Sequence, residues 1–143
     1  ITGALKNQFG CLMETNKAIY HPHIHEVIVD VNLAFKPDLT IMDGIIAHSG
    51  FGPTNGTPIR LNLLIVSKDP VAVDSFAANI FGFKPSSIKY LKLASKKGLG
   101  SINYTLFGDS VDYSYARMHL SDKLILQIVD FLNSIGVRAS QGL

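Results

Sequence analysis

The chain has 143 residues, 47% of them hydrophobic, so it is long enough to bury one substantial core. Thirteen basic and eleven acidic residues give a formal net charge of +2, too near neutral to favour a nucleic-acid partner. The single cysteine, Cys11, excludes an intrachain disulfide and a four-cysteine iron–sulphur site within the sequence. No apolar run reaches the roughly 18 to 20 residues of a membrane span and no signal peptide is evident, so we expect a cytoplasmic protein without a membrane partner.

The first half of the chain predicts one helix and one strand. Residues 1–20 mix residue types and glycines, which favours turns with at most a short helix. An amphipathic helix is predicted from His21 to Phe35, because hydrophobic residues recur there at helical spacing. Lys36-Pro37 ends it, since a residue before proline disfavours helical angles. The apolar run Leu39–Ile46 then predicts a buried strand.

The second half alternates in the same way. Leu61–Ser67 predicts a second strand, and Asp69 with Pro70 predicts the cap and first residue of a helix that ends at Gly82. We expect further elements at residues 85–97 (helix), 102–108 (edge strand), 109–120 (loop) and from Ser121 or Asp122 to Gly136 (helix).

This order of elements predicts one α/β domain over residues 1–143, in which helices flank a layered sheet of few strands. The sheet is short for its helices, and the chain begins at Ile1 rather than at methionine. We therefore expect it to be a fragment of a longer chain and part of a larger α/β domain.

The predicted site lies where the first strand meets a glycine-rich segment. The strand reaches Asp43-Gly44, and Gly50, Gly52 and Gly56 follow. Open α/β sheets bind ligands just beyond the carboxyl ends of their strands, so Asp43 is a candidate general acid or base, and the glycine N–H groups are candidate ligand contacts. The alternative is a purely structural connection between two strands. The segment is neither a Walker loop nor a dinucleotide fingerprint, because no Gly-Lys-Ser/Thr follows and prolines interrupt it.

Other polar residues could complete such a crevice. Lys6 and Asn7 suit a carboxylate or phosphate, and His21 suits a proton donor. Cys11 is a candidate thiol participant, with a buried hydrophobic role as the alternative. Asp74, one turn into its helix, either points at the crevice or is structural. His21 and His25 would share a helix face, but we expect solvated histidines rather than a metal site.

Several blocks in order resemble the family known as domain of unknown function 362. They are Leu5–Cys11, Lys17 with Tyr20-His21, Lys36–Ile45, Gly50–Pro53 with Gly56 and Pro58, Asp69–Asp74, and Gly98–Gly100. This family is associated with iron–sulphur proteins, and many members carry a ferredoxin-like module whose cysteine motifs this chain lacks. The resemblance therefore implies a cluster elsewhere in a full-length protein and none in this chain. The sequence departs from the family at His48-Ser49 and Phe51, where glutamate and asparagine are more usual.

Two functions follow from these residues and the resemblance. The leading hypothesis is a redox-linked enzyme subdomain acting on a small anionic substrate, with electrons from an iron–sulphur module outside the chain. Asp43 or His21 would then move protons, and Lys6 would hold the anion. The competing hypothesis is a non-catalytic domain that binds a metabolite or docks the redox module. Convergence of Lys6, His21 and Asp43 on one pocket distinguishes the two.

Overall fold

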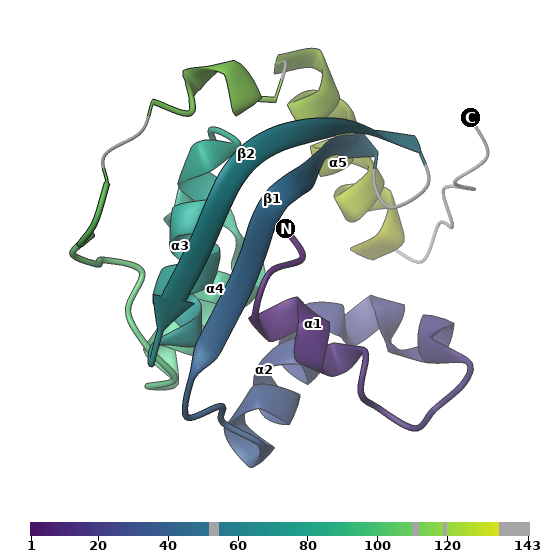
Figure 1. Cartoon of the computed structure of the whole chain (residues 1–143). Helices are drawn as coiled ribbons and strands as arrows, with labels where there is room; N and C mark the ends of the chain where they lie inside the picture. The colour runs from purple at the N-terminus through teal and green to yellow at the C-terminus, as the bar shows by residue number, and fades with distance from the viewer. Residues whose placement is uncertain (52–54, 110–111, 119, 135–143) are drawn as a thin grey trace.

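A long β-hairpin crosses a layer of helices in the computed structural model, which describes residues 1–51, 55–109, 112–118 and 120–134. The fold is α/β. The strands β1 (Thr40–Phe51) and β2 (Asn55–Ser67) form a two-stranded antiparallel sheet. The helices are α1 (Leu5–Phe9), α2 (Ile24–Ala34), α3 (Pro70–Ile80), α4 (Lys89–Lys96) and α5 (Leu120–Ser134), with 3₁₀ turns η1 (Lys17–His23), η2 (Pro85–Ser87) and η3 (Ser114–Ala116). Figure 1 shows the hairpin passing diagonally across α3 and α4.

The main core lies among the helices rather than around the sheet. Its fully buried side chains include Leu5 of α1, Ile28 and Val29 of α2, Val71 of α3 and Leu91 of α4. A smaller cluster ties the hairpin down, where Leu61 of β2 packs with Ile80 and Ala116. Burying each such aliphatic side chain contributes roughly 1.5–3 kcal/mol, so the helical layer carries most of the stability.

Helix boundaries follow local signals where these are strong. The prediction for α3 is confirmed: Pro70 is its first residue, and Asp69 Oδ1 accepts the Ala72 N–H at 2.9 Å. The predicted last helix is confirmed as α5, although its predicted end at Gly136 lies outside the described residues. The helix expected from His21 begins instead at Ile24, because the preceding turn is a 3₁₀ helix containing Pro22. The helix expected at 85–97 is shortened to α4 by the extended backbone of Ile88.

The predicted strand arrangement is wrong in two respects. The first strand does not end at Ile46 but continues to Phe51, and it pairs with β2 as a hairpin. In an antiparallel pair neighbouring strands end at opposite edges, so no crevice forms at shared carboxyl ends. The edge strand expected at residues 102–108 is absent from this fully described segment. Its Tyr104 packs edge-on against Phe76 of α3 instead of pairing in the sheet.

A bulge bends the hairpin near its middle. Gly44 pairs with Leu63 whereas Ile46 pairs with Arg60, so β2 has one residue more than β1 between these pairs. Asn62 takes up the extra residue with φ of 51°, in the left-handed region that asparagine tolerates better than most residues. Leu61, the residue before Asn62, packs in the small cluster.

We predict that the positive φ of Asn62 determines which substitutions at this position destabilise the protein. Asn62→Gly should leave the free energy of unfolding within about 1 kcal/mol of wild type, whereas Asn62→Val should lower it by about 1–2 kcal/mol. Urea denaturation measures both, with Thr57→Val at an exposed position of β2 as the control. Equal stability of the Val and Gly variants at position 62 would contradict the bulge geometry.

Candidate functional site

Asp43, the centre of the predicted site, faces solvent on the outer side of the hairpin. Its Oδ1 accepts the N–H of Ile45 at 2.8 Å, so the carboxylate supports its own turn beside the bulge. Met42 points the other way, because its sulphur lies 3.1 Å from the position a Cβ would take at Gly3. Successive strand residues point to opposite faces. Asp43 and the opening segment with Asp74 therefore lie on opposite sides of the hairpin, and the predicted shared crevice is wrong.

The other residues predicted for chemistry are exposed and line neither cavity described below. Lys6 and Asn7 lie on the exposed side of α1, and His21 is exposed in η1. Cys11 is an exposed free thiol, so its alternative role as a buried hydrophobe is wrong. The Lys17 ammonium donates to the carbonyl of Gly10 and fixes the turn next to Cys11. Roles in binding or proton transfer for these residues stay predictions.

The glycines predicted to hold a ligand belong to the hairpin. Gly44 is buried, and a Cβ there would lie 3.3 Å from the Leu63 carbonyl oxygen. Gly50 pairs with Gly56 across the strands and has φ of +83°, which requires glycine. Gly52 lies outside the described residues. Gly44 and Gly50 thus have structural reasons to be glycine.

Asp74 is fully buried and holds the opening segment in place. Its two carboxylate oxygens accept the N–H groups of Ala4 at 2.6 Å and of Leu5 at 3.0 Å. Asn32 completes the attachment, since its Nδ2 donates to the Leu5 carbonyl at 2.9 Å. Burial raises the pKa of Asp74, and the two backbone N–H bonds offset that rise in part. Of the two roles considered for Asp74, the structural one matches this geometry.

Asp69 has a similar structural role one turn earlier. Besides capping α3, its Oδ2 accepts the N–H of Ser101 at 2.7 Å, and a Cβ at Gly100 would overlap the carboxylate. The block Asp69–Asp74 therefore fastens two distant segments to α3. These hydrogen bonds give the Asp69 and Asp74 carboxylates a structural role that needs no ligand.

A cleft runs between β2, α3 and the segment Tyr104–Asp109. It encloses about 520 Å³ and is lined by β2 residues Asn62–Ser67, by Ala72, Val73 and Phe76 of α3, and by Tyr113. The sequence signal for this cleft is a group of aromatic residues, since Tyr104, Phe107 and Tyr113 all line it. Phe76 contacts Tyr104 and Tyr113 edge-on, with ring centroids 5.9 and 6.4 Å apart.

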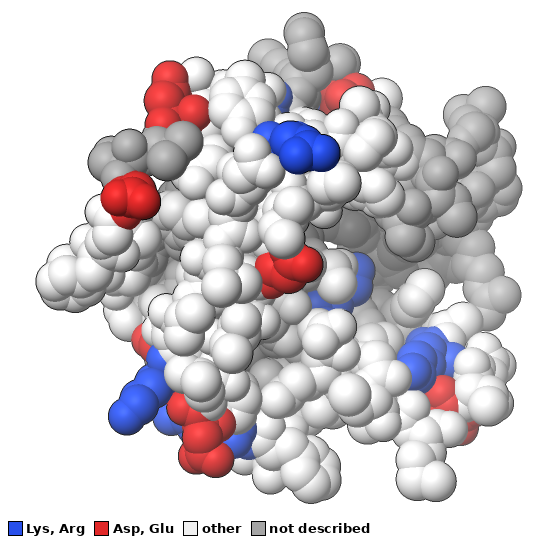
Figure 2. Space-filling model, viewed as in Figure 1, with Lys and Arg blue, Asp and Glu red and all other residues white. Residues whose placement is uncertain are grey.

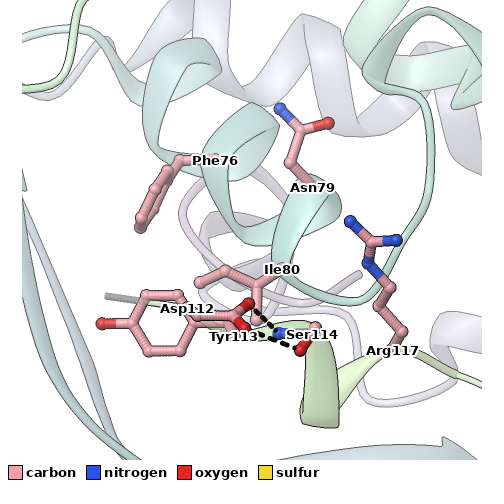
Figure 3. A pocket seen from close by; sticks show the side chains of 7 residues that line it. All are labelled: Phe76, Asn79, Ile80, Asp112, Tyr113, Ser114 and Arg117. Carbon is pink, nitrogen blue, oxygen red and sulfur yellow. Dashed lines mark hydrogen bonds between the residues drawn. The ribbon is translucent and has the colours of Figure 1, made fainter. Parts of the chain in front are cut away.

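A smaller cavity of about 180 Å³ continues beyond this aromatic group at the end of α3 (Figure 3). It shares Phe76 and Tyr113 with the cleft and is otherwise lined by Asn79, Ile80, Asp112, Ser114 and Arg117. Asp112 accepts from the Ser114 N–H at 2.8 Å and from its hydroxyl at 3.0 Å. These two bonds lower the pKa of Asp112, with a smaller contribution from Arg117, so the cavity carries a carboxylate anion.

Comparison with known proteins adds a family to this geometry. The model of the family described as Domain of unknown function (DUF362) matches residues 1–79, more than half of the chain. The chain belongs to the DUF362 family. A curated thylakoid-associated protein of Synechocystis is 35% identical over 106 residues, which are 69% of the DUF362 chain and 33% of that relative. No solved structure matches the chain.

The family match covers only part of the residues that line the two cavities. Residues 1–79 include β2 and most of α3, which form one wall and the floor of the cleft. The lining residues from 104–109 and 112–117 lie beyond the match. Within the described part of the DUF362 chain, no three His, Cys, Asp or Glu side chains are grouped closely enough to hold one metal ion. None of the described helices is both long and apolar enough to cross a membrane.

We predict an unusual pH dependence from Asp74. An acid whose folded-state pKa is raised binds more protons in the folded than in the unfolded state, so stability falls as pH rises from 3.8 through the folded pKa. The free energy of unfolding of wild type, minus that of Asp74→Asn, should therefore decrease from about pH 4 to neutrality. Urea denaturation at several pH values measures this difference.

A second measurement covers the case in which Asp74→Asn does not fold. A carbon-13 NMR titration of the wild-type Asp74 carboxyl should give a midpoint above 3.8. A midpoint below that value, or a stability difference that grows with pH, would show that the Ala4 and Leu5 hydrogen bonds outweigh burial.

Proposed function

We propose that this DUF362 chain is a non-catalytic docking domain, and that its cleft receives an extended polypeptide segment from outside the 143 residues. The observation that carries the proposal is the cleft itself, which runs along the open side of β2. The residues expected to perform catalysis support it indirectly, because Lys6, His21 and Asp43 line neither cavity.

The edge of β2 supplies the binding chemistry. The sheet has two strands, so β2 pairs with β1 on one side and borders the cleft on the other. Among the described residues, no backbone hydrogen bond outside the hairpin involves the segment Asn62–Ser67. An unpaired strand edge beside a groove is the surface on which peptides bind by adding a strand, with side-chain pockets giving specificity.

The outer face of the hairpin also supports a docking role. Ile41, Ile45, Leu64 and Val66 lie there with exposed fractions of 63, 52, 64 and 55%. Charged groups are sparse over the hairpin in Figure 2. Exposed aliphatic surface of this kind, here interrupted by the carboxylate of Asp43, marks interaction sites more often than free surface.

The Synechocystis relative is consistent with a partner in the same polypeptide, because its matched part is only 33% of its length. We propose that the docked partner is the iron–sulphur module expected from the family resemblance. A redox-linked reaction on a small anion would then belong to the assembled protein rather than to Lys6, His21, Cys11 and Asp43 alone. A cytoplasmic location stays a prediction.

Peptides selected by phage display on this chain test the docking proposal. A selected peptide, titrated into ¹⁵N-labelled protein, should shift the amide signals of Asn62–Ser67 and 104–109 and slow hydrogen exchange along β2. Ala72→Arg places a long cation on the cleft floor and should weaken binding about tenfold or more, because a buried, unpaired charge is costly.

Ala34→Arg, at an exposed position near the end of α2, is the matched control and should bind like wild type. Selection of no peptide above background would refute the proposal. So would peptides whose binding shifts map away from β2 or tolerate Ala72→Arg.

A further inference from the structure

The cavity of about 180 Å³ at the end of α3 combines opposite charges with apolar walls. Its volume is below the roughly 300–1,000 Å³ of pockets for drug-sized ligands, so it suits a small metabolite. In Figure 3 Phe76 and Tyr113 lie on one side, Arg117 and Asn79 on the other, and Asp112 with Ser114 below them. This arrangement separates an apolar region from a polar one.

Arg117 supplies the positive group. Its side chain is exposed and follows η3 directly. Within the described part of the chain no hydrogen bond or ion pair of its guanidinium is found, so its donors are available to a ligand. A guanidinium presents paired N–H donors that match a carboxylate in a bidentate way.

Asp112 and Asn79 supply acceptors on the same cavity. Each Asp112 oxygen accepts one bond from Ser114, which fixes the carboxylate and leaves it further lone pairs. Asn79 donates through Nδ2 to the Tyr104 hydroxyl at 2.8 Å, so its Oδ1 is the remaining amide acceptor. The Asp112 carboxylate suits an ammonium group, which has three donors and no acceptor, and Asn79 Oδ1 is a separate acceptor on the cavity wall.

We propose that this cavity binds a small zwitterion, an α-amino acid of about the size of leucine. Its carboxylate pairs with Arg117, and its ammonium donates to Asp112. Its aliphatic side chain packs on Phe76, Ile80 and Tyr113. This site is separate from the residues predicted for anion binding, and it does not depend on a peptide occupying the cleft.

Three probes of matched shape test the charge pattern. L-Leucine carries both charges, 4-methylpentanoate lacks the ammonium, and 3-methylbutylamine lacks the carboxylate. In NMR titrations of the ¹⁵N-labelled chain, leucine should shift the signals of Asn79, Ser114 and Arg117. Each analogue should bind about tenfold more weakly, because it loses one set of charged hydrogen bonds.

Two variants assign each charge to its residue. Arg117→Gln should abolish the preference for leucine over 3-methylbutylamine, and Asp112→Asn should abolish the preference for leucine over 4-methylpentanoate. Both side chains are exposed, so neither change should unfold the protein. Arg60→Gln is the matched control, since Arg60 is exposed on β2 and lines neither cavity.

The proposal predicts binding that depends on both charges and on both residues. Absence of leucine binding at millimolar concentration, equal affinity for all three probes, or leucine binding unchanged in Arg117→Gln would each overturn it. Peptide binding in the β2 cleft is measured on different signals, so either proposal can fail while the other stands.

Discussion

The buried carboxylate of Asp74 is the contact on which the helical layer depends. It accepts the first free N–H groups of the opening segment, at Ala4 and Leu5, and so places the Leu5 side chain in the main core. Gly3 has to be glycine for this approach, because a Cβ there would overlap the Asp74 carboxylate. A charged or protonated group without these partners would cost several kcal/mol in such a site.

The hairpin, unlike the opening segment, is attached to the helices over only part of its surface. It rests on the helices through one face and a small cluster around Leu61, and it leaves its outer face and the far edge of β2 open. A two-stranded sheet is marginal by itself, so its stability comes from the helices beneath it. Because its outer face and one edge are exposed, the hairpin depends on the helices for stability. The same exposed surface is available to bind another polypeptide segment.

The predicted crevice is wrong for one topological reason. An apolar run followed by an acidic residue and glycines can be the end of a parallel strand. The same pattern fits a bulged hairpin equally well, because periodicity carries no information on strand direction. In the hairpin, Asp43 braces a turn on the outer face, whereas Asp74 lies beneath the inner face. The two cavities form instead along α3, from residues that are distant in sequence and belong to no motif.

The sequence by itself determined the α/β class, the family, the cap and start of α3, and the amphipathic helices, because each rests on interactions between residues a few positions apart. Only the tertiary structure decided the direction of strand pairing, the structural roles of Asp69 and Asp74, and the cavity that Asn79, Asp112 and Arg117 line together. The carboxylate contacts of Asp69 with Ser101 and of Asp74 with Leu5 span 32 and 69 positions. Such contacts are set by packing of the whole chain, which local spacing does not encode.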